Sequence, residues 1–257
     1  MMRLDQELWV AILGLSSNKK NMKTLKLALI TGLLLACGQA TQATTYTDAT
    51  GENFNPNGIL DISSVEVNNT ATDLIFKINL TGDPIATDWG KYMIGINTGV
   101  GSTDTAGNGW NRPISASYGL NYWIGSWVDG GNGAELWHYV PGWTLTEATY
   151  NAPPNNDISI SKDTSSVTIT TLLSNLGLAP GNSFQFDVFT SGGGGGDGAV
   201  DALNNPAQTI ADWGNAYDSG TVTPSSYTVT AVPEPSLVAL LALGGLGLTA
   251  YRFRRPA

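Results

Sequence analysis

Cysteine and histidine are almost absent from this sequence, which has one of each in 257 residues. The cysteine is Cys37, close to the N-terminus, so the rest of the chain can form neither an internal disulfide nor a thiolate metal site. The neighbours of His138 place it on the core-facing side of a predicted strand. The sequence therefore argues against a multi-histidine zinc site and against a Ser-His-Asp or Cys-His catalytic arrangement, and we expect a protein that is not an enzyme.

Positive charge is equally scarce between residues 44 and 231. This segment holds 18 acidic residues and 4 basic ones, a net charge of −14, and the basic residues are Lys77, Lys91, Arg112 and Lys162. Such an acidic domain repels phosphate backbones, which excludes nucleic acid as a partner and leaves neutral ligands, cations or cationic surfaces. Carboxylates in excess of their basic partners also suggest a bound cation.

The N-terminal region has the pattern of an export signal. Two lysines after Met22 precede an apolar stretch of about ten residues, too short to span a bilayer, and small residues then lead to a cleavage site before Thr44. We predict a signal peptide at 22–43, used by the Sec export machinery, and interpret residues 1–21 as a spurious extension. A lipobox ending at Cys37, which would then carry a lipid, is the alternative.

The C-terminal region combines three features in order. Pro233, Glu234 and Pro235 come first, an apolar stretch at 237–251 follows, and the chain ends with an arginine cluster formed by Arg252, Arg254 and Arg255. The prolines keep the segment extended and accessible, the apolar stretch is expected to enter the bilayer as a transmembrane helix, and the arginines hold its end in the cytoplasm.

This arrangement, over residues 232–257, resembles the PEP-CTERM sorting signal. The resemblance implies that an exosortase, an enzyme of Gram-negative bacteria that make exopolysaccharide, recognises and removes the segment. We therefore expect an inner-membrane precursor and a mature protein at the cell surface or in the extracellular matrix. An ordinary single-pass membrane anchor is the alternative.

Residues 44–231 are expected to form one all-β domain. Short segments rich in β-branched and aromatic residues recur between clusters of Gly, Asn, Asp and Pro, without a long stretch of helical period. They predict strands at 60–67, 73–80, 92–97, 122–128, 135–140, 158–161, 167–171, 183–190 and 227–231, and short helical turns at 172–178 and 200–203. Many short strands with frequent turns favour a single β-sandwich of jelly-roll type.

Two parts of this domain resemble a group of β-sandwiches that includes DOMON-like domains and family-nine carbohydrate-binding modules. Residues 62–67 and 73–80 resemble the opening hairpin of the group, and 172–190 resemble its small helix and the strand that follows. The resemblance implies a domain that binds sugars or, in some branches, haem.

A Gly-rich turn at 129–133 joins two aromatic segments into a predicted β-hairpin. A symmetric loop would pair Gly125 with Trp137, and alternation would then place on one face the four rings of Trp123, Trp127, Trp137 and Tyr139. Flat indoles can stack on the C–H faces of sugars and Glu135 can hydrogen-bond their hydroxyls, so these rings and Glu135 are the candidate carbohydrate site. The alternative is that the rings pack the interior of the sandwich.

Acidic residues gather in two loop regions where calcium would find oxygen ligands. The first group, at the start of the domain, supplies our candidate metal ligands Asp48, Glu52 and Asp61. The second group follows a glycine run and consists of Asp197, Asp201 and Asp212. Neither group has the spacing of an EF-hand, and solvated loop acids are the alternative.

Two further patterns have plain structural interpretations. The tripeptide Asp-Trp-Gly occurs at 88–90 and again at 212–214, which predicts two similar loop corners filled by tryptophan, with ligand contact as the alternative. The run at 193–198 satisfies G-x-G-x-x-G, but no βαβ unit surrounds it, so we interpret it as a flexible loop.

The sequence as a whole favours an exported, exosortase-sorted protein of the cell surface or matrix that binds polysaccharide, with calcium as a candidate cofactor. Two alternatives remain open. One is a glycoside-active enzyme that uses a pair of carboxylates, and the other is a purely structural matrix protein.

Overall fold

The computed structural model describes residues 43–220 and 222–232. These residues are almost entirely strand and loop, with two single turns of 3₁₀ helix, η1 (Gly58–Leu60) and η2 (Leu173–Leu176). The all-β prediction is therefore confirmed. In these described ranges no helix is long and apolar enough to cross a bilayer. Most of the predicted signal peptide and the whole predicted transmembrane segment 237–251 lie outside them.

The first sheet has five antiparallel strands in the order β1-β2-β3-β10-β9. Their bounds are β1 (Thr44–Thr47), β2 (Ile62–Asn69), β3 (Asp73–Leu80), β10 (Ser166–Leu172) and β9 (Ile158–Lys162). Strand β3 alternates between buried and half-buried positions, as a strand with one face on a core should. The hairpin of β2 and β3 is the one predicted from the sequence.

The second sheet has seven strands. Six follow the order β12-β11-β4-β6-β7-β8, and β14 pairs with β11. Their bounds are β12 (Asp201–Ala202), β11 (Ser183–Ser191), β4 (Lys91–Asn97), β6 (Tyr122–Trp127), β7 (Gly133–Tyr139), β8 (Trp143–Ala148) and β14 (Ser225–Thr228). A separate parallel pair joins β5 (Ile114–Ser115) to β13 (Tyr217–Asp218). Neither large sheet closes into a barrel.

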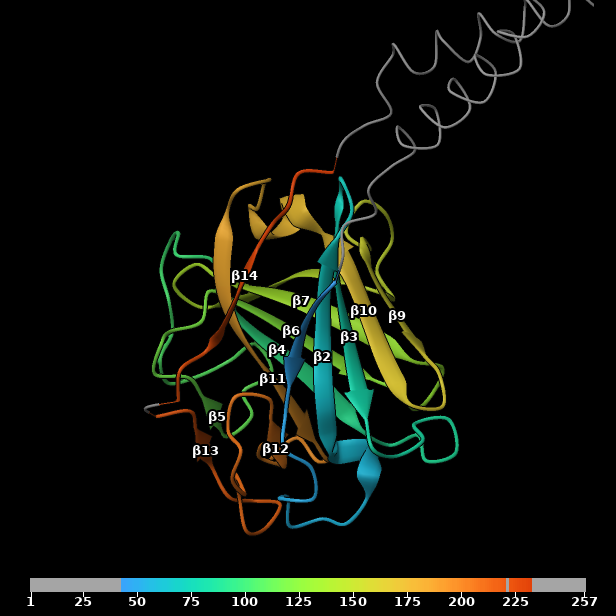
Figure 1. Ribbon diagram of the computed structural model, residues 1–257. Helices are drawn as coiled ribbons and strands as arrows, with labels where there is room; N and C mark the ends of the chain where they lie inside the picture. The colour runs from blue at the N-terminus through green and yellow to red at the C-terminus, as the bar shows by residue number, and fades with distance from the viewer. Residues whose placement is uncertain (1–42, 221, 233–257) are drawn as a thin grey trace, which may run out of the picture. The chain divides into compact units, whose positions relative to one another are not determined.

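The main hydrophobic core lies between the two sheets, whose strands cross one another at an angle (Figure 1). On the first sheet, β3 supplies Phe76. The ring of Phe76 contacts the rings of Phe184 and Phe186 on β11 of the second sheet, with centroids 6.2 and 5.5 Å apart. These contacts bury the inner face of each sheet.

A second core covers the outer face of the seven-stranded sheet. Strand residues Met93, Trp123 and Phe189 are buried there beneath the loops and the short strands β5 and β13, whose covering residues include Ile114, Leu120, Val200, Ile210 and Tyr217. Strand β4 is consequently buried on both faces, which explains its uninterrupted apolar run Tyr92–Ile96. The second core positions the candidate site, because it decides which aromatic rings of this face remain accessible.

Several expected elements differ from those observed. Residues 200–203 form the short strand β12 and not a helical turn, because Asp201 and Ala202 pair with the edge of β11. The last strand lies at Ser225–Thr228 and not at 227–231. Strand β8 was not predicted, because threonine and glutamate make its sequence only weakly apolar. It forms a strand by pairing with β7.

Candidate functional site

The hairpin of β6 and β7 has a register two residues away from the predicted one. Trp123 pairs with Trp137, Gly125 with Glu135 and Trp127 with Gly133, because the connecting loop is 128–132 and Gly133 already belongs to the strand. A two-residue shift preserves the side on which each side chain lies. The candidate rings therefore do share one face, but with partners different from those expected.

Trp123 does not belong to an accessible surface, which corrects its assignment as a carbohydrate contact. Its exposed fraction is 0%, and its ring stacks on that of Phe189 with centroids 5.9 Å apart. The second core covers this end of the hairpin. The interpretation of interior packing is thus correct for Trp123.

The other rings of this face form what we call the aromatic surface. Trp127, Trp137 and Tyr139 are half-buried, and they are joined by three residues from outside the hairpin, namely Trp110, Trp143 and Tyr150. Tyr150 is 61% exposed. The ring of Trp127 contacts those of Trp110 and Tyr150, at centroid distances of 6.3 and 6.4 Å. The rings of Tyr139 and Trp143 make a second contact at 5.4 Å.

Glu135 accepts hydrogen bonds from three rings of the aromatic surface. Its Oε2 accepts hydrogen bonds from Trp110 Nε1 at 2.6 Å and Trp137 Nε1 at 2.9 Å, and its Oε1 accepts one from the Tyr150 hydroxyl at 2.5 Å. The bond to Glu135, followed by burial, raises the pKa of Tyr150 to about 12, so the phenol stays protonated at neutral pH. Only one acceptor position on Oε1 remains free. Glu135 is therefore mainly a residue that orients the rings.

Two glycines allow the indoles to lie close against the sheet. A Cβ on Gly125 would collide with the ring of Trp110, and one on Gly133 would collide with the ring of Trp127. Gly125 therefore makes room for Trp110 and not for Trp137, the residue with which it was predicted to pair. The ring of Trp137 instead packs against Gly109, where a Cβ would lie 2.5 Å away.

Sequence reasoning missed Trp110, Trp143 and Tyr150. Trp110 and Tyr150 lie in loops outside the predicted hairpin, and Trp143 begins a strand that was not predicted. Gly125 was the available signal, because a glycine inside a strand marks the close approach of another group. The sequence cannot say which group approaches.

The two Asp-Trp-Gly tripeptides meet in space. The rings of Trp89 and Trp213 pack edge to face with centroids 6.0 Å apart, and Phe54 packs against Trp213 at 5.1 Å. All three rings border the second core. The interpretation of loop corners filled by tryptophan is confirmed, and the tryptophan of each corner packs against that of the other.

The candidate metal ligands are divided by the structure. Asp48 and Glu52 come together with Asp201, and their carboxylate oxygens lie within 4.8 Å of one another. Asp61 is not a member of this group. Its oxygens accept hydrogen bonds from Gly51 N at 3.1 and 3.2 Å and from Thr81 Oγ1 at 2.8 Å, so it fixes the loop beside the cluster.

We call Asp48, Glu52 and Asp201 the carboxylate cluster. Burial, with help from the neighbouring carboxylates, raises the pKa of Asp48 to about 8, and burial raises the pKa of Asp201 as well. Asp201 was missed as a partner because it lies about 150 residues along the chain from Asp48. In the sequence it belongs to the second group of acidic residues. Only the pairing of β12 with β11 brings it near.

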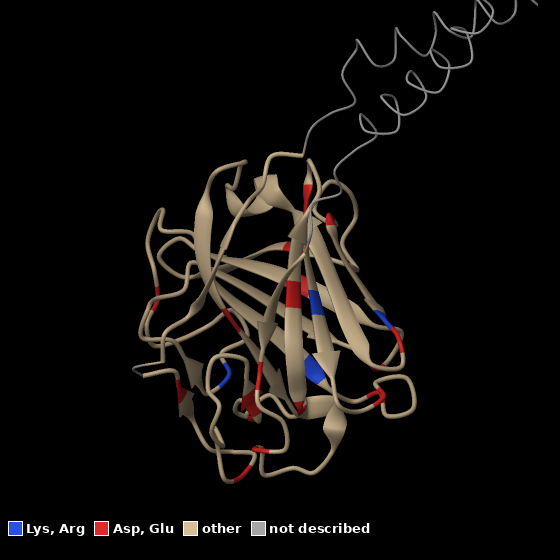
Figure 2. Ribbon diagram, viewed as in Figure 1, with Lys and Arg blue, Asp and Glu red and all other residues tan. Residues whose placement is uncertain are grey.

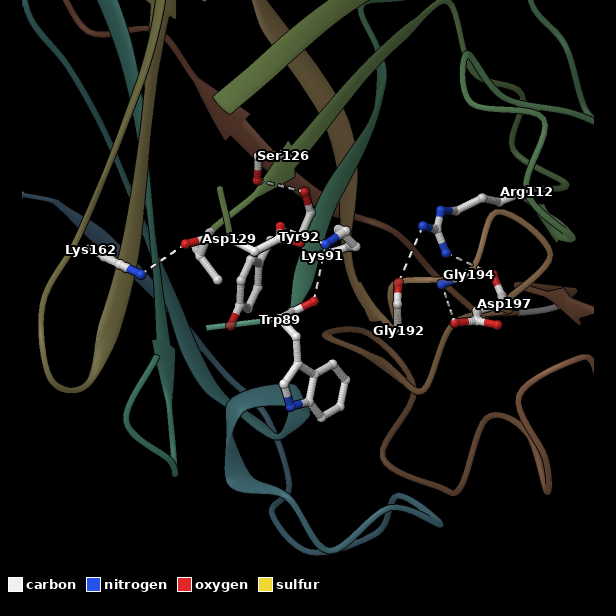
Figure 3. Close-up of polar contacts among 11 residues, drawn as sticks. Trp89, Lys91, Tyr92, Arg112, Ser126, Asp129, Lys162, Gly192, Gly194 and Asp197 are labelled. Carbon is white, nitrogen blue, oxygen red and sulfur yellow. Dashed lines mark hydrogen bonds and ion pairs between the residues drawn. The ribbon is translucent and has the colours of Figure 1, made fainter. Parts of the chain in front are cut away.

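The glycine run is a structural loop. Arg112 donates to the carbonyls of Gly192 and Asp197, both at 3.2 Å (Figure 3), and its guanidinium also donates to Ser191 Oγ at 2.8 Å. The Gly194 amide donates to Asp197 Oδ2 at 2.8 Å. The loop therefore closes on itself and on a buried arginine, which differs from the flexible loop interpreted from the sequence.

His138 has no catalytic arrangement around it among the described residues. Its ring stacks on that of Tyr122, with centroids 4.4 Å apart and planes 6° from parallel. Partial burial lowers its pKa. The contact places His138 on the core-facing side of β7, as predicted.

Comparison with known proteins identifies one motif. The PEP-CTERM protein-sorting motif matches residues 231–255, a range that includes Pro233, Glu234, Pro235 and the arginines Arg252, Arg254 and Arg255. The chain thus carries this sorting signal, which implies export, processing by an exosortase and sorting to the cell surface. The match does not extend into the all-β part.

No curated protein matches the chain. One similar solved structure comes from work on the pH-induced modulation of Streptococcus parasanguinis adhesion by Fap1 fimbriae, with 16% identity over 74% of this chain and 83% of the other. Its TM-score of 0.18 is too low to support a shared fold.

Proposed function

We propose that this chain is an exported, exosortase-processed extracellular protein that binds polysaccharide through the aromatic surface. In this proposal residues 22–43 direct Sec-dependent export, and 237–251 hold the precursor in the inner membrane of a Gram-negative bacterium. The two packed sheets are a β-sandwich of jelly-roll type that remains outside the cell after processing. The sorting motif at 231–255 supports export, and the aromatic surface supports a binding role.

One observation carries the binding proposal. On the outer face of the seven-stranded sheet the ring of Trp127 contacts those of Trp110 and Tyr150, and hydrogen bonds to Glu135 orient Trp110 and Tyr150. Rings fixed in this way lose little conformational freedom when a flat ligand stacks on them. Sugars present flat apolar C–H faces that can stack on these rings. A domain with few basic side chains favours neutral glycans over anionic ones.

Trp127→Ala is expected to reduce retention of the purified protein on an extracellular polysaccharide at least tenfold. The Trp127 ring contacts both the Trp110 ring and the Tyr150 ring, so its loss removes two ring contacts of the aromatic surface. The measurement is affinity electrophoresis or pull-down with the insoluble polymer, alongside thermal unfolding.

Trp89→Ala is the matched control, because Trp89 is a half-buried tryptophan that packs on Trp213, outside the aromatic surface. It should leave retention unchanged. Equal retention of wild type and Trp127→Ala would remove the aromatic surface as the binding site. Release of soluble sugar from the retained polymer would favour the glycoside-active enzyme.

Replacement of Pro233, Glu234 and Pro235 by alanine is expected to leave an unprocessed precursor in the membrane fraction. The change removes the recognised tripeptide while the apolar stretch at 237–251 stays intact. Immunoblots of fractionated cells measure precursor and mature forms. Normal release of a shortened protein would show that the motif does not direct processing.

A further inference from the structure

We propose that Asp48, Glu52 and Asp201 bind a divalent cation of the calcium type, in a site that does not depend on glycan binding. The carboxylate oxygens of the three residues lie within 4.8 Å of one another, so one ion can contact all of them. A donor set made of carboxylate oxygens suits a hard cation, and calcium tolerates irregular oxygen coordination.

The cluster contains buried oxygens that have no hydrogen-bond partner. They are Asp48 Oδ2 and both Oε atoms of Glu52, each almost completely hidden from solvent. Buried polar atoms in native proteins are nearly always paired, and buried charges are paired or coordinate metals. The carboxylate end of Glu52 thus lies in the cluster without a hydrogen-bond donor to satisfy it.

Asp201 is the fixed member of the cluster. It is 1% exposed, and it accepts hydrogen bonds from the backbone amides of Ile62 at Oδ2, 2.7 Å, and of Ala202 at Oδ1, 2.8 Å. Each of these oxygens keeps a second lone pair. Two amide donors therefore hold the carboxylate in one orientation while leaving it able to bind an ion.

No basic side chain of residues 43–220 and 222–232 neutralises the cluster. The domain has few Lys and Arg residues (Figure 2), and each is engaged elsewhere. Lys77 pairs with Glu66 at 3.6 Å and Lys91 with Asp129 at 2.8 Å, Lys162 donates to the carbonyl of Val128, and Arg112 holds the glycine run. Positive charge must therefore come from a bound cation or from protons shared between the carboxylates.

The position of the cluster suggests what the ion does. Asp48 follows strand β1 of the five-stranded sheet, and Glu52 lies four residues further on. Asp201 begins β12, which pairs with β11 of the seven-stranded sheet. The ion would therefore link the two sheets at this edge and hold the start of the domain in place.

The test uses the purified full-length protein and calcium chloride as the probe. We expect saturable binding in calorimetry with a Kd of about 10⁻⁴–10⁻³ M, the range of extracellular calcium modules. A hundredfold excess of calcium over Kd should raise Tm by about 5 to 10 °C, and a chelator should reverse the shift. Absence of both binding and a Tm shift would overturn the proposal.

Glu52→Gln should weaken calcium binding at least tenfold and remove the Tm shift. Without calcium the same variant should be at least as stable as wild type, because it replaces an unpaired buried charge by a neutral group of the same shape. Asp48→Asn is the second variant and should also lose the shift. Glu66→Gln, which makes the same charge change outside the cluster, should keep it.

These variants separate the cation from the alternative of shared protons. If the carboxylates only share protons, Glu52→Gln would raise stability while calcium and chelator would leave wild type unchanged. That result would overturn the proposal, as would an equal calcium shift in wild type and Glu52→Gln. Glycan retention is measured separately, so loss of the aromatic-surface function does not decide this site.

Discussion

Trp123→Ala is expected to lower the free energy of unfolding by about 3 to 5 kcal/mol, the usual cost of truncating a buried tryptophan. The side chain is fully buried and stacks on Phe189 in the second core. Its loss would leave a cavity beneath the long loops that cover the outer face of the seven-stranded sheet. Urea unfolding followed by fluorescence or circular dichroism measures the change.

Trp123→Phe is the informative companion. The indole Nε1 of Trp123 is buried and has no hydrogen-bond partner, so phenylalanine retains most of the packing without an unpaired donor. We expect Trp123→Phe to cost much less than Trp123→Ala. If Trp123→Ala cost under about 1 kcal/mol, Trp123 could not be a core residue by the usual scale of such substitutions.

Asp187→Asn is expected to make the protein more stable at pH 8 and to leave its stability nearly unchanged at pH 4. Asp187 is 1% exposed, its Oδ1 accepts from the amides of Val188 and Asn204, and its Oδ2 has no partner. Burial raises the pKa of this carboxyl to about 7. An asparagine retains the accepting oxygen and carries no charge.

The direction follows from proton linkage. With a raised pKa, the folded protein keeps the Asp187 proton over a pH range where the unfolded chain has released it, roughly pH 4 to 7. The wild-type protein therefore loses stability as pH rises through this range, by up to about 4 kcal/mol from this group. The asparagine variant lacks that loss.

Denaturant unfolding at pH 4, 6 and 8 without added divalent cations measures the effect. Asp88→Asn is the control, because Asp88 is exposed and its replacement makes the same change in net charge. It should shift stability little at any of the three pH values. Parallel pH profiles for wild type and Asp187→Asn would show that the Asp187 carboxyl is not buried as described.

The candidate surface shows where reasoning from the sequence succeeded and where it failed. Alternation in a strand assigned Trp123, Trp127, Trp137 and Tyr139 correctly to one side of the hairpin, since that side depends only on parity. Parity does not say what covers the side. The second core buries Trp123, while Trp127 and Tyr139 remain half-exposed.

The carboxylate cluster illustrates the same limit at longer range. Asp48 and Glu52 could be paired from the sequence because they are neighbours in one loop. Asp61, also near in the sequence, instead accepts hydrogen bonds from Gly51 and Thr81, while Asp201 joins the cluster from the far part of the chain. Proximity along the chain is a weak guide where loops of different strands meet at a sheet edge.

The sequence by itself determined the all-β fold, the strands that alternate and the sorting motif near the C-terminus, because each depends on residues close together in the chain. Only the tertiary structure decided the register of the aromatic hairpin, the burial of Trp123, the arrival of Trp110 over Gly125 and the choice of Asp201 over Asp61. Those four outcomes depend on which distant loops pack on the outer face and edge of one sheet. That packing results from long-range burial of apolar surface, which local patterns do not encode.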